Sequence, residues 1–260
     1  GHVAPFTSWE DAATNIQAAI DAAVYGDTVT VSNGVYEFGG KVKAGDLTNR
    51  IAVDKPILVR SVNGPHQTIV QGVWDATFTN GPGAIRCAWL TNGATLSGFT
   101  LRGGATRSGS SGNTSITSGG GVLGTSSGSL VTNCVITGNA AGSGGGGAYS
   151  NTVVNSILAG NIVIGSAGLA VYGGGAWYSV LKNCAILGNQ LLSSSVSSTY
   201  GGGAYYGALT NCLVAGNYAY YAGVYGIQTP VVNCILWSNT SPSVSVLNTN
   251  YSGNELIRYS

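Results

Sequence analysis

The side chains able to do acid–base chemistry are few and unevenly placed in this sequence. The chain of 260 residues holds nine acids, which are Glu10, Asp11, Asp21, Asp27, Glu37, Asp46, Asp54, Asp75 and Glu255. Hydrolysis of a glycosidic bond requires two carboxyl groups facing the scissile bond, and a calcium site requires several oxygen ligands. The stretch 76–254 contains no Asp or Glu, so it can supply neither arrangement.

The basic side chains do not compensate for that gap. The cations of the stretch 76–254 are Arg86, Arg102, Arg107 and Lys182. Asp46, Asp54 and Asp75 could converge earlier in the chain, but scattered acids are more often solvated turn residues. We therefore expect no catalytic residues, no metal site, no cofactor and no enzymatic activity.

Five cysteines also carry potential chemistry, and they are Cys87, Cys134, Cys184, Cys212 and Cys234. They form no CxxC-type cluster of the kind that zinc sites use. Four of them occupy one position of the repeated sequence described next, and Ser156 holds that position in the remaining copy. We predict that the four repeat cysteines form a ladder of small, buried, reduced side chains.

A nine-residue sequence recurs five times between residues 130 and 240, and it defines the elements that position these side chains. The copies are 131–139, 153–161, 181–189, 209–217 and 231–239. Their first Asn residues are separated by 22, 28, 28 and 22 residues. Self-similarity at such a period is typical of a solenoid, in which each repeat buries its apolar side against the next.

A second repeated sequence shows what each coil contains. Three glycines, an alanine and an aromatic residue recur at 145–149, 173–177 and 201–205, and 222–225 is a degenerate fourth copy. Short β-branched and aromatic runs between turn residues indicate strands. Strands so closely connected can stack in parallel only by coiling, so we predict a parallel β-helix.

Two columns of asparagine support the same fold. They are Asn133, Asn155, Asn183, Asn211 and Asn233, and Asn139, Asn161, Asn189, Asn217 and Asn239. Stacked asparagines pass side-chain hydrogen bonds from coil to coil and tolerate unusual turn backbone. Apolar spacing predicts one helix over 8–24, capped by Ser8 or Thr14, that covers the first coil.

These patterns divide the chain into four parts. We predict a cap at 1–26, irregular early coils at 27–118, regular coils at 119–240 and a C-terminal cap or tail at 241–260. The chain contains no methionine, so we expect a processed or excised piece whose secretory signal has been removed.

The opening residues 12–21, 26–31 and 34–36 resemble the start of right-handed parallel β-helix proteins with the pectate-lyase-type fold. The repeats are similar to those of large bacterial surface and secreted β-helix proteins, which overlap the polymorphic outer-membrane type. The resemblance covers nearly the whole chain and implies an all-β, right-handed parallel β-helix with an N-terminal capping α-helix. The same fold hosts polysaccharide lyases, galacturonan hydrolases and pectin esterases. Its lyases pair an Arg or Lys base with Ca²⁺ held by acidic side chains, which 76–254 lacks.

Composition limits the partners. Charged residues make up 7% of the chain and the net charge is +1, so no field attracts nucleic acid or an anionic membrane. No apolar run is long enough for a transmembrane segment. Little charge together with many Ser, Thr, Asn and Tyr residues is typical of a secreted or cell-surface protein.

Two sets of side chains are candidate binding surfaces. An aromatic strip that could stack sugars comprises Tyr149, Trp177, Tyr178, Tyr205, Tyr206 and Tyr225. The alternative is a ladder of rings that packs only on itself. If the repeat cysteines point inward, alternation along the strands predicts an outward apolar row for self-association, comprising Val135, Ile157, Ala185, Leu213 and Ile235, unless a loop such as 191–200 covers it. The reverse parity would instead turn Ile136, Leu158, Ile186, Val214 and Leu236 outward.

We therefore expect a non-catalytic, structural or adhesive β-helix that associates with copies of itself in an extracellular array or filament. A carbohydrate-binding β-helix is the alternative function. A polysaccharide lyase or hydrolase is a third possibility, which the scarcity of acids disfavours.

Overall fold

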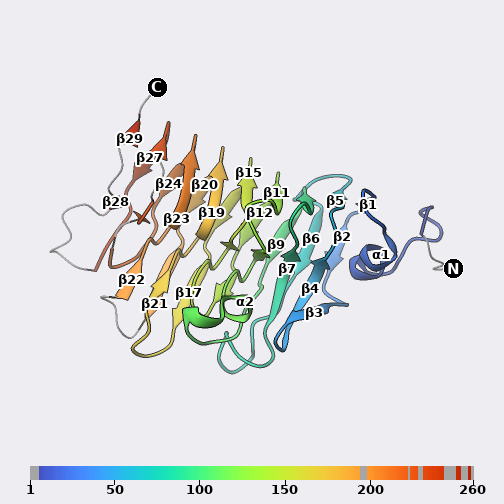
Figure 1. Cartoon of the computed structure of the whole chain (residues 1–260), viewed down its shortest axis with the longest axis horizontal. Coiled ribbons are helices and arrows are strands. Elements are labelled where there is room, and N and C mark those ends of the chain that lie inside the picture. The colour runs from blue at the N-terminus through green and yellow to red at the C-terminus, as the bar shows by residue number, and fades with distance from the viewer. Residues whose placement is uncertain are drawn as a thin grey trace.

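The chain folds into a right-handed parallel β-helix whose first coil is capped by a helix (Figure 1). The structure is a computed structural model, and it describes residues 6–193, 198–221, 223–227, 231–242, 250–252 and 257–258. The coils follow one another from the N-terminus to the C-terminus along the long axis of the molecule. Apart from one hairpin, every named pair of neighbouring strands is parallel, as stacking by coiling requires.

The first face of the solenoid is built from one strand of each coil. Its strands are β1 (Thr28–Val31), β5 (Leu58–Ser61), β8 (Thr95–Ser97), β11 (Leu130–Thr132), β15 (Thr152–Val154), the second halves of β19 (Ala176–Lys182) and β23 (Ala204–Thr210), β26 (Val231–Val232) and β29 (Ile257–Arg258).

The second face precedes the first in each regular coil. Its strands are β3 (Lys41–Ala44), β4 (Leu47–Val53), β7 (Ile85–Leu90), β10 (Val122–Gly124), β14 (Ala148–Tyr149), the first halves of β19 and β23, β25 (Val224–Tyr225) and β28 (Tyr251–Ser252). The hairpin β3–β4 is the antiparallel pair. Because β19 and β23 run across the corner, these two faces form a single 16-stranded sheet.

The third face is a separate sheet of eight strands. They are β2 (Gly34–Tyr36), β6 (Thr68–Gln71), β9 (Thr100–Arg102), β12 (Val135–Thr137), β16 (Ile157–Ala159), β20 (Ala185–Leu187), β24 (Leu213–Ala215) and β27 (Ile235–Trp237). Smaller elements complete the coils, namely β13 (Ala140–Ala141), β17 (Ile162–Gly165), β21 (Gln190–Ser193), β18 (Val171–Tyr172), β22 (Thr199–Tyr200), the 3₁₀-helix η1 (Ser111–Asn113) and α2 (Thr114–Thr117).

Single residues in the left-handed backbone region turn the chain between faces. The predicted Asn133 column occupies the corner between the first and third faces, with φ between +51° and +54°. Asparagine tolerates this region better than most residues do. The second column, from Asn139 to Asn239, is buried. Each of its first four members donates through Nδ2 to Oδ1 of the next member at 2.9 Å, so the predicted ladder is confirmed.

The core is a line of small and branched side chains along the solenoid axis. All five cysteines are buried and free, as predicted for the four in the repeat, and Ser156 fills their position in the second repeat copy. Ile136, Leu158, Ile186 and Val214 are fully buried beside them. The chain therefore buries an unbroken apolar core with little charge.

The capping helix α1 (Ile16–Ala22) is shorter than predicted. Its N-cap is Asn15, whose Oδ1 accepts the N–H of Ala18 at 2.9 Å. The prediction of a helix from residue 8, capped by Ser8 or Thr14, was wrong because Ser8 instead bonds to Asp11 in a separate turn. Ile16 and Ile20 close the end of the core. The side chain of Gln17 accepts the Ala52 N–H and donates to the Ala52 carbonyl. It thus satisfies backbone groups of β4 that a neighbouring strand would otherwise bond.

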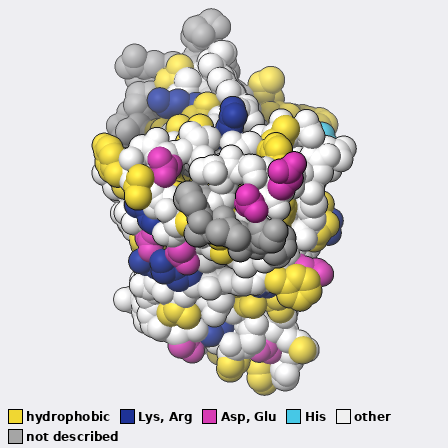
Figure 2. Space-filling view, turned by 90° about the vertical axis from the view of Figure 1, so that its right-hand side faces the viewer, with side chains coloured by type: hydrophobic (Ala, Val, Ile, Leu, Met, Phe, Trp, Pro, Cys, Tyr) yellow, Lys and Arg dark blue, Asp and Glu magenta, His cyan; other side chains and the backbone are white. Residues whose placement is uncertain are grey.

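Charge gathers at this N-terminal end, where Figure 2 shows basic and acidic side chains beside large apolar ones. Lys41 pairs with Asp21 and Asp54 at 2.9 and 2.8 Å, and Lys43 pairs with Asp54 at 3.1 Å. The boundaries at 26, 118 and 240 remain predictions, and most of the predicted tail at 241–260 lies outside the described residues. No helix in the described parts of the chain is long and apolar enough to cross a membrane.

Candidate functional site

The third face presents a row of apolar side chains to solvent. The predicted row Val135, Ile157, Ala185, Leu213 and Ile235 occupies the first positions of β12, β16, β20, β24 and β27, where the register pairs each residue with the next. The exposed fractions of Ile157, Leu213 and Ile235 are 41, 38 and 66%, and the other two are half-buried. The described part of the chain therefore leaves the row uncovered, whereas residues 194–197 of the suggested covering loop lie outside the described residues.

A second outward row lies two residues further along the same strands. Its members are Thr137, Ala159, Leu187, Ala215 and Trp237, and Trp237 is 70% exposed. In the earlier coils this position holds Gln71 and Arg102, which are hydrogen-bonded to each other. We use the term apolar face for the outward residues of β16, β20, β24 and β27, which are Ile157, Ala159, Ala185, Leu187, Leu213, Ala215, Ile235 and Trp237.

A polar border runs along one edge of the apolar face. Asn155, Asn183, Asn211 and Asn233 turn the chain there and are exposed. Each of the last three donates through Nδ2 to Oδ1 of the preceding member, at 2.8–3.0 Å. The apolar face is thus uncharged, regular at the strand spacing, and bounded by a rigid row of amides.

The aromatic strip lies on the second face and at its corner. Tyr149, Trp177, Tyr205 and Tyr225 are in register on β14, β19, β23 and β25, with successive ring centroids 5.1, 6.4 and 5.9 Å apart. Tyr178 and Tyr206 occupy the next corner with centroids 5.4 Å apart. The structure therefore brings together all six predicted rings.

A third column of rings, which the sequence analysis missed, packs against the strip. Tyr172, Tyr200 and Tyr221 stack with centroids 5.8 and 4.9 Å apart, and Tyr172 also stacks on Tyr205 at 4.7 Å. The available signal was a Tyr directly before the triple glycine in two copies, at residues 172 and 200. The ring faces are thus largely taken up by other rings. Tyr178, 49% exposed, offers the most ring surface, and sugar binding there remains a prediction.

The acids of the early coils do not converge. Asp54 binds the two lysines of β3. Burial is the largest single influence on the pKa of its carboxyl group and raises it, but the two lysines together outweigh burial, so the pKa is lowered. Asp46 pairs with Arg107 at 3.2 Å. Asp75 accepts the backbone N–H groups of Gly83, Thr77 and Phe78, which lower its pKa. Within the described residues, no three His, Cys, Asp or Glu side chains are grouped to hold a metal.

One cation of the later chain, Arg86, is held in the interior by several hydrogen bonds. Arg86 is fully buried and donates to Asn49 Oδ1 and to the carbonyls of Ser115, Ser118 and Gly119 at 2.8–2.9 Å. Burial lowers its pKa to about 9. Nothing repeats around Arg86 in the sequence, so its burial could not be predicted. Its role in the structure is to hold the segment 115–119 against β4.

Comparisons with known proteins gave matches among solved structures alone. No protein-family model and no curated protein sequence matches the chain. Among solved structures, it is similar to a pectin methylesterase from Aspergillus niger, with 13% sequence identity and a TM-score of 0.38, over 92% of this chain and 82% of the other. The chain is a right-handed parallel β-helix protein.

The expectation that the protein is not an enzyme needs correction. The matched structure is that of an enzyme, a pectin methylesterase, so this fold does not support excluding catalysis. At 13% identity and a TM-score of 0.38, the likeness concerns the fold and assigns no activity. The lack of acids between 76 and 254 is therefore a fact about composition and does not decide whether the protein is an enzyme.

Proposed function

We propose that this protein is an extracellular or cell-surface structural component whose apolar face packs against the same face of a second copy. The observation that carries the proposal is the register of Ile157, Leu213 and Ile235, which are exposed and in line on neighbouring coils. An apolar strand face that faces away from its own core is typical of a sheet covered on both sides. Contiguous exposed apolar surface marks interaction sites.

The chemistry of the apolar face suits a second copy. A flat sheet face packs best on another flat face, about 10 Å away. The apolar face carries no charge, so two copies meet without repulsion. A two-fold axis through it places apolar coils on apolar coils and leaves Arg102, on the polar earlier coils, outside the contact.

The size of the apolar face sets the expected strength of association. Four strands about 4.8 Å apart and three residues long cover roughly 19 by 10 Å. This patch is smaller than the ~800 Å² per partner of a standard stable interface. We infer weak, concentration-dependent pairing, which gains strength when many copies are held side by side. The similarity of the repeats to bacterial surface β-helix proteins supports such a setting.

Sedimentation velocity over a range of concentrations tests the proposal. The wild-type chain should sediment faster as concentration rises, and a variant with Ile157→Lys, Leu213→Lys and Ile235→Lys should stay monomeric. A wild-type chain that remains strictly monomeric at high concentration would contradict the proposal.

The matched control places the same three charges on another face. Thr132, Val154 and Thr210 share a register position with Lys182 on the first face, so lysine is already accommodated there. The triple variant Thr132→Lys, Val154→Lys and Thr210→Lys should associate like the wild type. Circular dichroism and melting temperature verify that both triple variants remain folded, and equal loss of association in both would also contradict the proposal.

A further inference from the structure

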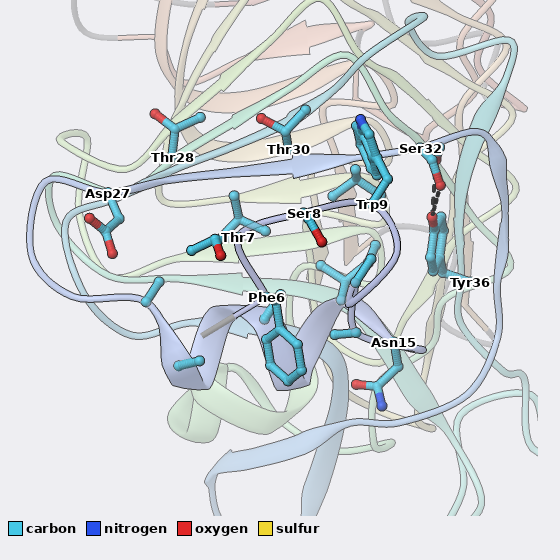
Figure 3. A pocket seen from close by; sticks show the side chains of 18 residues that line it. Phe6, Thr7, Ser8, Trp9, Asn15, Asp27, Thr28, Thr30, Ser32 and Tyr36 are labelled. Carbon is cyan, nitrogen blue, oxygen red and sulfur yellow. Dashed lines mark hydrogen bonds between the residues drawn. The ribbon is translucent and has the colours of Figure 1, made fainter. Parts of the chain in front are cut away.

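A pocket of about 490 Å³ lies at the N-terminal end of the solenoid, away from the apolar face. It is bordered by α1, by β1 and by the segment 6–15, and it is open to solvent on one side (Figure 3). Ile16, Ala19, Val29 and Val31 are among its apolar lining residues, and Thr28, Thr30, Ser32 and Tyr36 are among its polar ones. The pocket lies at the outer end of the first described coil, which α1 covers only in part.

One wall of the pocket is the free edge of β1, which lies at the end of its sheet and pairs with β5 alone. The N–H groups of Leu58 and Val62 donate to the carbonyls of Asp27 and Val31 at 3.0 and 2.9 Å. In a parallel ladder, alternate residues bond to the same neighbour. Thr28 and Thr30 therefore direct their N–H and C=O groups away from β5. No described residue on that side hydrogen-bonds to them.

We propose that this pocket binds an extended peptide as an additional strand beside β1. The backbone groups of Thr28 and Thr30 supply two donors and two acceptors at the spacing of a strand, which is how sheet edges recognise peptides. Every second peptide side chain would face the wall formed by Ala19, Ala22 and Ala23, so small apolar side chains fit there. Four residues match the length of β1.

Charge sets the direction of the peptide. Asp27, at the start of β1, is the one charged residue among the described residues that line the pocket. The ammonium group of Lys55 is occupied by the carbonyls of Ile20, Asp21 and Ala23. A peptide parallel to β1 brings its amino terminus to the Asp27 end, whereas an antiparallel one would bring its carboxyl terminus there. The expected ligand is a peptide with a free α-amino group, parallel to β1.

The probe is the tetrapeptide amide Thr-Val-Thr-Val, which copies β1 and has a free amino terminus. Titration of the isotope-labelled protein should give saturable shifts of the Thr28 and Thr30 amide resonances. Acetylation of the peptide amine, or Asp27→Asn in the protein, should weaken binding several-fold at low salt. Shifts confined to distant residues would overturn the proposal.

Two N-methylated peptides test the strand geometry. One carries N-methyl groups on residues 2 and 4, and the other carries one on residue 3. Only one of these sets points at β1, because successive peptide N–H groups of a strand point to opposite sides. One methylated peptide should lose binding at least tenfold while the other retains it. Equal behaviour of the two would overturn the proposal.

Two protein variants locate the site. Thr30→Pro removes an edge-facing donor that the β5 ladder does not use, a position where strands tolerate proline. Ala22→Trp fills the pocket from an exposed position of α1. Each should abolish binding while the melting temperature stays within a few degrees of the wild type. Retained binding in a folded Ala22→Trp protein would overturn the proposal. This outcome does not bear on self-association, because the pocket and the apolar face are separate.

Discussion

The side-chain amide of Asn189 and the backbone N–H of Asn189 both donate to Oδ1 of Asn217, each at 2.9 Å. Asn161 makes the same two bonds to Asn189, and Asn189 Nδ2 also donates to the carbonyl of Leu158 at 2.9 Å. One buried side chain thus fixes the turn of its own coil and joins it to the coils on both sides.

Replacing Asn189 with alanine should therefore be costly. The change removes the Asn189 Oδ1 acceptor of both Asn161 donors and the amide donor to the Leu158 carbonyl inside the core. Asn217 Oδ1 then keeps only the backbone N–H of residue 189. Each buried unpaired group costs about 1–3 kcal/mol, so we expect a loss of more than ~3 kcal/mol, measured by urea unfolding. Asn183→Gly, at an exposed turn with φ of +54°, should cost less than ~1 kcal/mol. Equal losses would show that the buried ladder is not special.

Cys134→Ser should leave the fold intact and remove a pH dependence. Burial raises the pKa of the Cys134 thiol to about 11 from its ordinary 9.0. Between these values the unfolded chain loses a proton that the folded chain keeps, so stability falls by up to ~1.4 kcal/mol per pH unit and is unaffected below pH 9. Serine occupies the same position at Ser156, where its hydroxyl donates to the Val154 carbonyl.

The measurement is the difference in melting temperature between wild type and Cys134→Ser from pH 7 to 11. The difference should be constant up to about pH 9 and should then move in favour of the serine variant. A difference that does not change with pH would contradict the assignment. Alkylation of the native wild-type protein at pH 8 should modify none of the five cysteines, and prior unfolding should expose them all.

Arg86→Met should destabilise the chain by about 3 kcal/mol or more. Removal of the guanidinium takes the donor from Asn49 Oδ1 and from the carbonyls of Ser118 and Gly119, which are buried, and from that of Ser115, which is half-buried. Unpaired buried groups are costly. Arg102→Met is the matched control because Arg102 is exposed and bonds to Gln71, so its loss should cost under ~0.5 kcal/mol. Hydrogen exchange should show faster opening of 111–119 in Arg86→Met, and unchanged protection there would contradict the role of Arg86.

Gly144→Ala should be destabilising because its new methyl group would overlap the Trp177 ring and lie 2.8 Å from the Tyr172 carbonyl. Overpacking of this kind costs about 1–3 kcal/mol. In the background of Trp177→Ala the cost should shrink, which a double-mutant cycle by thermal unfolding measures. Gly112→Ala, which meets only Ser110 Oγ at 3.5 Å, is the control and should be near neutral. A cost that is equal in both backgrounds would contradict the contact.

The parts of the fold that repeat could be predicted from the sequence, because a residue type that recurs at the same position in several copies must suit the same structural position in each coil. Asn at one position in five copies indicated a turn with unusual backbone geometry. Asn183 and Asn211 indeed have the positive φ of the left-handed region. If Cys212 and Val214 point inward, alternation places Leu213 on the outside, and the structure buries both Cys212 and Val214. The exposed apolar row followed from the same argument.

The parts that occur once could not be predicted in this way. The N-cap of α1 is Asn15, which has an extended backbone. From the sequence alone, Ser8 and Thr14 were the predicted caps. In the hairpin of β3 and β4, Lys41 and Lys43 form ion pairs with Asp54, which no periodicity in the sequence predicts. The pocket beside β1 lies at the last strand of its sheet, where no repeated sequence could indicate it.

The two asparagine ladders also give the molecule an electrical direction. In the buried ladder each amide donates toward the C-terminal neighbour, as Asn161 does to Asn189, whereas in the exposed ladder Asn211 donates toward the N-terminal neighbour Asn183. The solenoid thus contains two antiparallel rows of aligned amide dipoles. Water screens the dipoles of the outer row far more than those of the inner row. The field of the inner row is therefore not cancelled, and the electrostatic potential differs between the two ends of the solenoid.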